Sequence, residues 1–346
     1  MSFMVKQLKI KKAKSRGLQG KKRPEFRRST MEGSSPNGTF QFNLKINHFD
    51  MPPVARYPMF FLGLLIYLFS VFCNLTILVL IVRQRNLHKP MFIILFSLPL
   101  NDLMGITVML PRVLADIVTL EHSVYYPTCV LQAFLLHMYG GGILFLLAVM
   151  ALDRYAAICK PLRYNSIMTP FTLFLLIASA WGLDLILVGG LFILQVRLPR
   201  CRNFIRNVYC DNPSLVNLSC DSDLTVNNIY GLAITAAMQI ISVSIQLFSY
   251  VHILVTCLHH RQTDARSKAL NTCLTQIAVF LLFECVTTVT ILSYRFKDVS
   301  ANLQKVSGML IFLILPVCNP VLYGIKNKEL RETLLTIVRK QKVASI

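Results

Sequence analysis

Seven long apolar stretches constrain the fold of this 346-residue chain more than any other feature. A helix needs about 20 consecutive apolar residues to cross the hydrocarbon core of a bilayer, and each stretch reaches that length. The alternation of a membrane β-barrel is not seen, and a helix bonds its own backbone within lipid. A composition of 54% hydrophobic and 15% charged residues agrees. We predict an all-α membrane protein, a seven-transmembrane helix bundle, with spans at 58–82, 91–115, 126–152, 170–194, 227–257, 269–293 and 303–325.

Lys and Arg in the short loops predict the orientation of the chain. Basic residues are enriched after the first, third, fifth and seventh spans, for example Arg83, Arg154, Arg261 and Lys326. Because basic loops are retained in the cytoplasm, the N-terminus is expected outside and the C-terminus inside.

The two ends of the chain differ in composition from the spans. We predict an extracellular tail at 1–57, a seven-transmembrane domain at 58–325 and a cytoplasmic segment at 326–346. Residues 1–30 are strongly basic, a pattern that can bind nucleic acid or acidic lipid. A basic arm resists export, so we expect translation from Met31 and no nucleic-acid partner. The last segment alternates apolar and basic residues, which predicts a short amphipathic eighth helix on the inner membrane lipid.

Modification sites are expected on the outer side. Glycosylation sequons begin at Asn37 in the tail and at Asn217 in the long outer loop. The outer side also carries four cysteines, which suits an oxidising surface and two disulfide bonds. The residues alone leave more than one pairing open for Cys129, Cys201, Cys210 and Cys220.

Motifs for enzyme chemistry are missing from the sequence. It has no phosphate-binding glycine loop, no nucleophile elbow and no metal-ligand spacing, so we predict neither an enzyme nor a cofactor. Asp102, Asp184 and Glu284 fall inside apolar spans, where ionisable groups are costly and usually functional. This supports a small-molecule transporter as an alternative, although the chain lacks the inverted repeat that many transporters show.

Several motifs in a fixed order carry a family resemblance. The stretch "MALDRYAAICKPLRY" at 150–164 ends the third span, preceded by "LHKPMF" at 87–92 and followed by "KALNTC" at 268–273 and "PVCNPVLYGIKNKELR" at 316–331. Together they resemble the odorant receptors among the rhodopsin-like G-protein-coupled receptors, over nearly all of 58–335. Arg295 suggests the fish-like (class I-like) subgroup. Cys73, Gln276 and Glu284 depart from the family's usual residues.

The resemblance implies a function. Such a receptor binds a small-molecule odorant in the outer half of the bundle and activates a heterotrimeric stimulatory olfactory G protein, which raises cyclic AMP. It implies the plasma membrane of sensory-neuron cilia as the location. A related receptor acting outside the nose is the alternative within the superfamily.

The resemblance also assigns roles to residues on the inner side and in the outer loop. The motif arginine is held by the neighbouring acid at rest and is freed for the G protein. Cys129 is implied to pair with Cys210, and Cys201 with Cys220. The switch residues are Asp153, Arg154, Tyr155, Tyr250 and Tyr323, and a polar network that can hold a sodium ion consists of Asn74, Asp102 and Asn319.

For the odorant, the resemblance indicates small and apolar residues on the third and sixth spans. His137 is equally compatible with an interior histidine, and the glycines with close helix packing. Arg295 could bind a carboxylate odorant or extend to the membrane interface. Glu284 is expected either to have a polar neighbour or to contact ligand. The ligand candidates are Ala133, Leu136, His137, Gly140, Gly141, Thr287, Thr288, Ile291 and Arg295.

Overall fold

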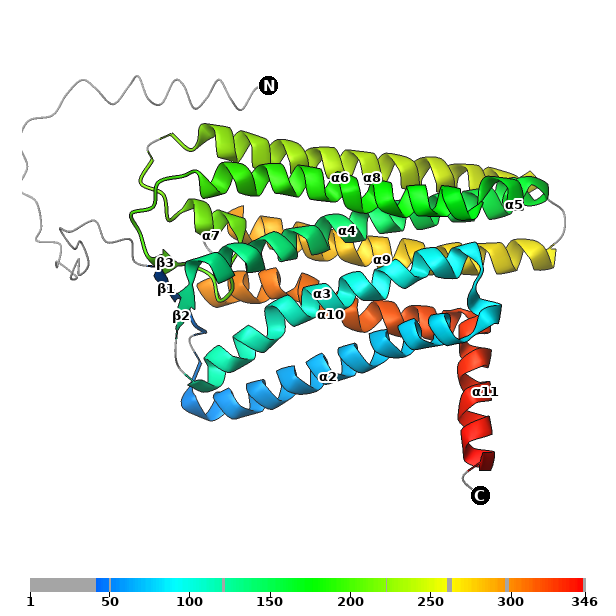
Figure 1. Ribbon diagram of the computed structural model, residues 1–346, viewed down its shortest axis with the longest axis horizontal. Coiled ribbons are helices and arrows are strands. Elements are labelled where there is room, and N and C mark those ends of the chain that lie inside the picture. Colours follow the sequence, from blue (N-terminus) through cyan, green and yellow to red (C-terminus); the bar gives the residue numbers. More distant parts are fainter. Residues whose placement is uncertain are drawn as a thin grey trace, which may run out of the picture. The chain divides into compact units, whose positions relative to one another are not determined.

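Seven long helices make up most of the computed structural model, which describes residues 42–49, 51–119, 122–221, 223–259, 263–295 and 299–344. Each of the seven is long and apolar enough to cross a membrane, and they run side by side in Figure 1. The prediction of a seven-helix bundle is confirmed. The helices are α2 (Pro53–Arg83), α3 (Pro90–Thr119), α4 (Tyr126–Cys159), α6 (Pro170–Val196), α8 (Thr225–His259), α9 (Thr263–Arg295) and α10 (Ala301–Lys326).

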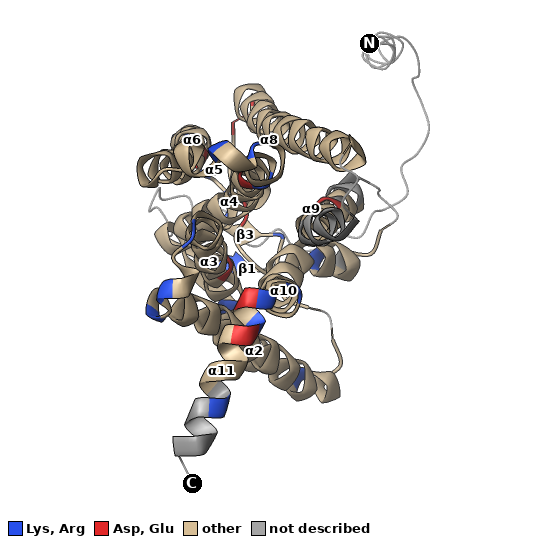
Figure 2. Cartoon of the chain, turned by 90° about the vertical axis from the view of Figure 1, so that its right-hand side faces the viewer, with Lys and Arg blue, Asp and Glu red and all other residues tan. Residues whose placement is uncertain are grey.

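Helix α4 lies at the centre of the bundle, with α3, α6 and α8 around it in Figure 2. Its side chains are buried over most of its length, whereas α6 and α8 turn many apolar side chains outward. Exposed residues such as Phe171, Ile186 and Ile240 suit a lipid environment, because lipid tails keep apolar side chains out of water.

Short elements connect the long helices at the end of the bundle that is expected in the cytoplasm. They are η1 (Arg85–Leu87), η2 (Pro161–Arg163) and α5 (Tyr164–Ile167). The eighth helix expected from the sequence is α11 (Lys328–Ala344), which runs across the direction of the bundle helices in Figure 1. Leu330 on α11 is buried against the bundle, while Arg331 and Glu332 are exposed.

A small sheet covers the opposite end, a feature that the all-helical prediction does not include. Strand β1 (Asn43–Ile46) pairs antiparallel with β2 (Ser123–Tyr125) and parallel with β3 (Phe204–Ile205). Leu44 and Ile46 of β1 are buried, and a short helix, α7 (Asn212–Val216), lies in the same outer loop region. Part of the predicted tail is therefore built into the folded domain, and α2 begins before the expected Pro58. Strands this short carry too little alternation to be recognised from sequence.

Candidate functional site

The acid and base at the inner end of α4 are bonded to each other. Arg154 Nη2 lies 2.8 Å from Asp153 Oδ2, and the Tyr164 hydroxyl donates to Asp153 Oδ1 at 2.8 Å. Asp153 is buried, and these two bonds satisfy both of its oxygens without water. Burial and the nearby Asp153 raise the pKa of Tyr164, which keeps its hydroxyl a donor at neutral pH. Tyr164 closes the sequence motif, but nothing in the sequence shows that it contacts Asp153.

The other predicted switch tyrosines make no described hydrogen bond with Arg154. Tyr250 donates to Gln276 Oε1 at 3.4 Å, and the buried Tyr323 hydroxyl has no partner among the described residues. The Tyr155 ring contacts Phe248 on α8, with centroids 5.4 Å apart. The structure therefore holds Arg154 with Asp153 and leaves Tyr250 and Tyr323 unbonded to it.

The expected polar network divides into two contacts with α10. Asn319 Nδ2 donates to both Asp102 oxygens, at 2.9 and 3.2 Å. Asn74 does not bond Asp102; its amide donates to the Pro316 carbonyl at 2.8 Å, and the Ser70 hydroxyl donates to the same oxygen at 2.8 Å.

Pro320 explains why the Pro316 carbonyl needs these donors. A helical carbonyl normally accepts from the N–H four residues later, and proline has no N–H. Within a bilayer that oxygen cannot turn to water, so side chains must supply the bond. Ser70 and Asn74 on α2 do so, and Ser70 is a site residue that the sequence reasoning missed.

Glycines on α4 bring neighbouring polar groups close to its backbone. A Cβ added at Gly141 would lie 2.0 Å from Asp184 Oδ1, and one at Gly142 would lie 2.6 Å from Asn101 Oδ1. Gly141 and Gly142 therefore serve close packing. A Cβ at Gly140 would meet nothing within 4 Å, so this glycine borders open space.

The ligand candidates on α4 extend from Ala133 to Gly141. Ala133 and Leu136 are buried. His137 Nδ1 lies 2.9 Å from the Ala133 carbonyl, which places its proton on Nδ1 and leaves Nε2 as an acceptor. Its ring also contacts Phe192 of α6, with centroids 5.4 Å apart.

On α9, the structure provides a polar neighbour for Glu284. Gln239 Nε2 on α8 donates to Glu284 Oε2 at 2.9 Å. The Thr287 hydroxyl is buried without a partner among the described residues, while Thr288 is exposed. The side chains of Ile291 and Arg295 lie outside the described part of the chain.

Two disulfide bonds hold the long outer loop. Cys129 at the start of α4 is bonded to Cys210, and Cys201 is bonded to Cys220, with Cα atoms 5.3 and 5.4 Å apart. These are the pairs that the resemblance implies. Asn217 lies between them and is partly exposed, next to a buried Leu218. Asn37, the other predicted glycosylation site, lies outside the described residues.

The bundle has the architecture of a rhodopsin-like receptor. Squid rhodopsin aligns with a TM-score of 0.66 and 15% identity, over 83% of this chain and 81% of that one. The family model described as "Olfactory receptor" matches residues 63–341, so the chain belongs to the olfactory receptor family. This is a family of odorant receptors and not of enzymes, as the motifs predict.

Individual relatives cover most of the chain. Human olfactory receptor 52B2 is 34% identical over 78% of this chain and 83% of its own length. Human olfactory receptor 52H1 is 34% identical over 80% and 88%. Mouse olfactory receptor 8G17 is 32% identical over 83% and 93%.

Proposed function

We propose that an odorant in the outer half of the bundle activates a stimulatory olfactory G protein by releasing Arg154 from Asp153. The observation that carries this proposal is the doubly satisfied Asp153 carboxylate, which keeps the guanidinium on α4. Once released, Arg154 is available to the G protein on the cytoplasmic side, and cyclic AMP rises.

The size of the required shift is modest. Hydrogen bonds to charged groups contribute about 1.5–3 kcal/mol each. A ligand shifts a two-state bundle only by its difference in affinity for the two states, and about 1.4 kcal/mol changes the ratio tenfold. A small odorant that favours the active arrangement by a few kcal/mol is therefore sufficient.

The finer features of the proposal come from the sequence. They are a carboxylate odorant bound at Arg295, membership of the fish-like subgroup, and location in the plasma membrane of sensory cilia. Glycosylation at Asn37 and Asn217 and contact of α11 with lipid belong to the same proposal. A guanidinium suits a carboxylate because it can donate two parallel hydrogen bonds.

A sodium ion near Asp102 also fits the residues present. Asp102 is fully buried, and the amide oxygens of Asn74 and Asn319 are buried without partners among the described residues. Oxygen acceptors of this kind suit a hard cation. We expect sodium chloride, compared with choline chloride, to lower ligand-free signalling in the wild type and to have no effect in Asp102→Asn.

The experiment that tests the proposal expresses the chain from Met31 with the stimulatory olfactory G protein. Cyclic AMP is recorded against carboxylate and neutral odorants, with surface expression matched between variants. The wild type should respond and Arg154→Ala should not. Arg295→Ala should lose carboxylates selectively. If no odorant raises cyclic AMP from receptor shown to be on the surface, the proposed coupling is wrong.

A further inference from the structure

A cavity of about 260 Å³ opens at the outer end of the bundle, and none of its described lining residues is a predicted odorant residue. We call it the outer vestibule. Its polar lining is made by Asn47, His48, Arg56, Asp116 and His122, which come from the segment after β1, the start of α2, the end of α3 and the approach to β2. Pockets for drug-sized ligands measure roughly 300–1,000 Å³, so this cavity suits a smaller molecule.

The acid in the vestibule is already neutralised. Arg112, one helical turn before Asp116 on α3, places Nη2 3.0 Å from Asp116 Oδ1 and donates from Nε to Oδ2 at 3.1 Å. This bidentate arrangement uses both carboxylate oxygens. Asp116 therefore has little remaining capacity to attract a cation, and Arg112 has little to attract an anion.

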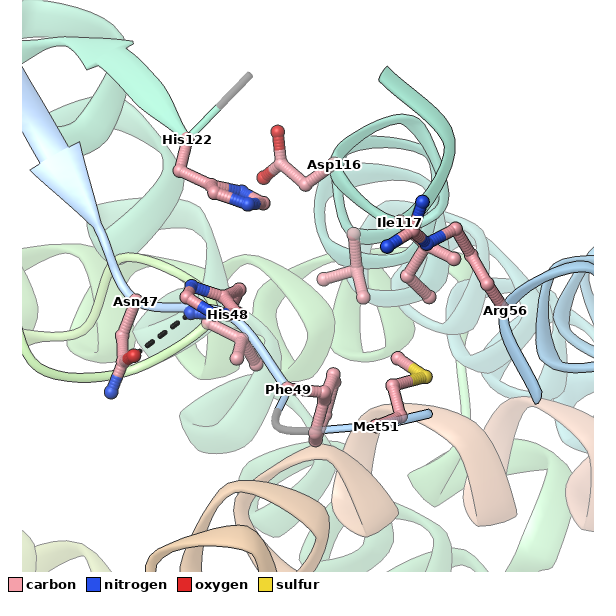
Figure 3. Close-up of a pocket in the computed structure, with 10 residues that line it drawn as sticks. Asn47, His48, Phe49, Met51, Arg56, Asp116, Ile117 and His122 are labelled. Carbon is pink, nitrogen blue, oxygen red and sulfur yellow. Dashed lines mark hydrogen bonds between the residues drawn. The ribbon is translucent and has the colours of Figure 1, made fainter. Parts of the chain in front are cut away.

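Arg56 is the cation that remains available. It makes no hydrogen bond or ion pair with any residue that the structure describes, and Figure 3 shows it extending from α2 toward Ile117 on α3. A guanidinium that is half-buried in a cavity and has no protein partner is suited to an anion from outside.

Two histidines face this arginine across the cavity. The rings of His48 and His122 are stacked, with centroids 4.6 Å apart and planes 12° apart (Figure 3). His122 Nδ1 is buried and has no partner among the described residues, so it needs a group that can complete a hydrogen bond. Lys305 on α10 also contacts this region, because its ammonium group donates to the His48 carbonyl.

The described charges around the vestibule are therefore Arg56, Arg112 and Lys305 against Asp116. The net charge of these four groups is positive, and protonation of either histidine would increase it. Asp50 and Glu121, which are chain neighbours of lining residues, lie outside the described part of the chain.

We propose that the outer vestibule is a second ligand site that binds a small monocarboxylate, with the Arg56 guanidinium and the His122 imidazole as its donors. None of its described lining residues belongs to the odorant site proposed at Arg295 on α9. Its occupation can be measured by binding alone, so the proposal does not depend on G-protein coupling.

The test uses the purified full chain in a maltoside detergent, which has no phosphate head group. Saturation-transfer NMR measures butyrate binding, with butyramide as the uncharged ligand of similar shape. The wild type should bind butyrate and bind butyramide much more weakly. Arg56→Gln should weaken butyrate binding roughly tenfold or more, the effect of losing a charge-assisted pair.

Control variants separate this site from others. Arg85→Gln changes an exposed arginine on the cytoplasmic side and should leave butyrate binding unchanged. Arg295→Ala removes the proposed odorant site on α9, and the loss caused by Arg56→Gln should persist in this background. His122→Gln gives a second variant within the vestibule and should weaken butyrate binding. Loss of binding in Arg295→Ala with retention in Arg56→Gln would assign the anion to α9 and overturn the proposal, as would equal binding of butyrate and butyramide.

Discussion

Tyr164 controls how firmly Asp153 is held in the resting receptor. Its hydroxyl is the only described donor to Asp153 Oδ1, while Arg154 occupies the other oxygen. We predict that Tyr164→Phe weakens the resting arrangement and raises ligand-free cyclic AMP. A hydrogen bond to a charged group contributes about 1.5–3 kcal/mol, so the increase should be roughly tenfold where the readout is not saturated.

Tyr125→Phe is the matched control for this variant. Tyr125 is half-exposed on the outer side, and its hydroxyl makes no hydrogen bond with a residue that the structure describes. Cyclic AMP is measured without odorant and normalised to surface receptor. An unchanged or lowered basal signal in Tyr164→Phe would show that its hydroxyl does not stabilise the resting state.

His122 makes carboxylate binding in the outer vestibule depend on pH. Burial, and then the stacked His48, lower its pKa; Arg112 and Arg56 act in the same direction and Asp116 opposes them. The free site therefore holds a neutral imidazole at neutral pH. A bound anion favours the imidazolium, so the pKa of His122 is higher in the complex and binding takes up a proton.

The affinity for butyrate should therefore rise as pH falls. We expect the dissociation constant to decrease severalfold between about pH 7.5 and about pH 5.5, a window that includes the ordinary histidine pKa of about 6.5 and remains above that of carboxylic acids. In His122→Gln the same titration should be much flatter. Weaker binding of butyrate by the wild type at the lower pH contradicts the assigned role.

The family resemblance identified the residues of the inner polar network, and the apolar span around Asp102 had already singled out that residue. Asp102 and Asn319 lie inside apolar spans, where a polar side chain needs a partner, and the structure pairs them. Ser70 and Tyr164 escaped notice, because a serine in a span and a tyrosine in a loop fit many environments. Their importance depends on contacts with distant segments that periodicity does not reveal.

Helix α10 depends on α2 at the carbonyl that Pro320 leaves without a donor. Ser70 and Asn74 both donate to Pro316, so either can maintain the bond when the other is removed. We predict that Ser70→Ala and Asn74→Ala each lower thermal stability modestly. The double variant should lose more than the sum, because only then is the carbonyl unsatisfied, at a cost of about 1–3 kcal/mol.

The melting temperature of the purified receptor measures this coupling. Thr76→Ala is the control, since the Thr76 hydroxyl bonds a carbonyl of its own helix on an exposed face. Thr76→Ala combined with Asn74→Ala should be additive. Additivity in the Ser70 and Asn74 pair would mean that the two donors do not share one function.

At the outer end, the pairing of β1 could not be predicted from the sequence. Its buried Leu44 and Ile46 lie in a polar tail, and its partners β2 and β3 are distant along the chain. Strand pairing over such separations depends on where the helices place the loops. The outer vestibule, which β1 helps to form, was missed for the same reason.

The basic loops at one end of the bundle could be predicted, because basic loops are retained on one side of the membrane during insertion. Several Lys and Arg residues lie at the end that faces the viewer in Figure 2, together with α11, while the sheet lies at the other end of the bundle, where Arg56 and Lys305 also lie. The seven spans follow from hydrophobic length alone. The packing order, with α4 at the centre, does not follow from hydrophobic length, because every span is apolar. Contacts between helices depend on details such as the close approach of Asp184 to Gly141.

Nucleotide exchange on the G protein tests the central claim most directly. Membranes containing the receptor and the stimulatory olfactory G protein are given the odorant that is most effective in the cyclic AMP assay, and binding of a non-hydrolysable GTP analogue is followed. The wild type should accelerate exchange severalfold with odorant, and Arg154→Ala, present in equal amount, should not. Equal acceleration by both proteins would contradict a switch built on the Asp153–Arg154 pair, and bound odorant without any acceleration in the wild type would contradict signalling through this G protein.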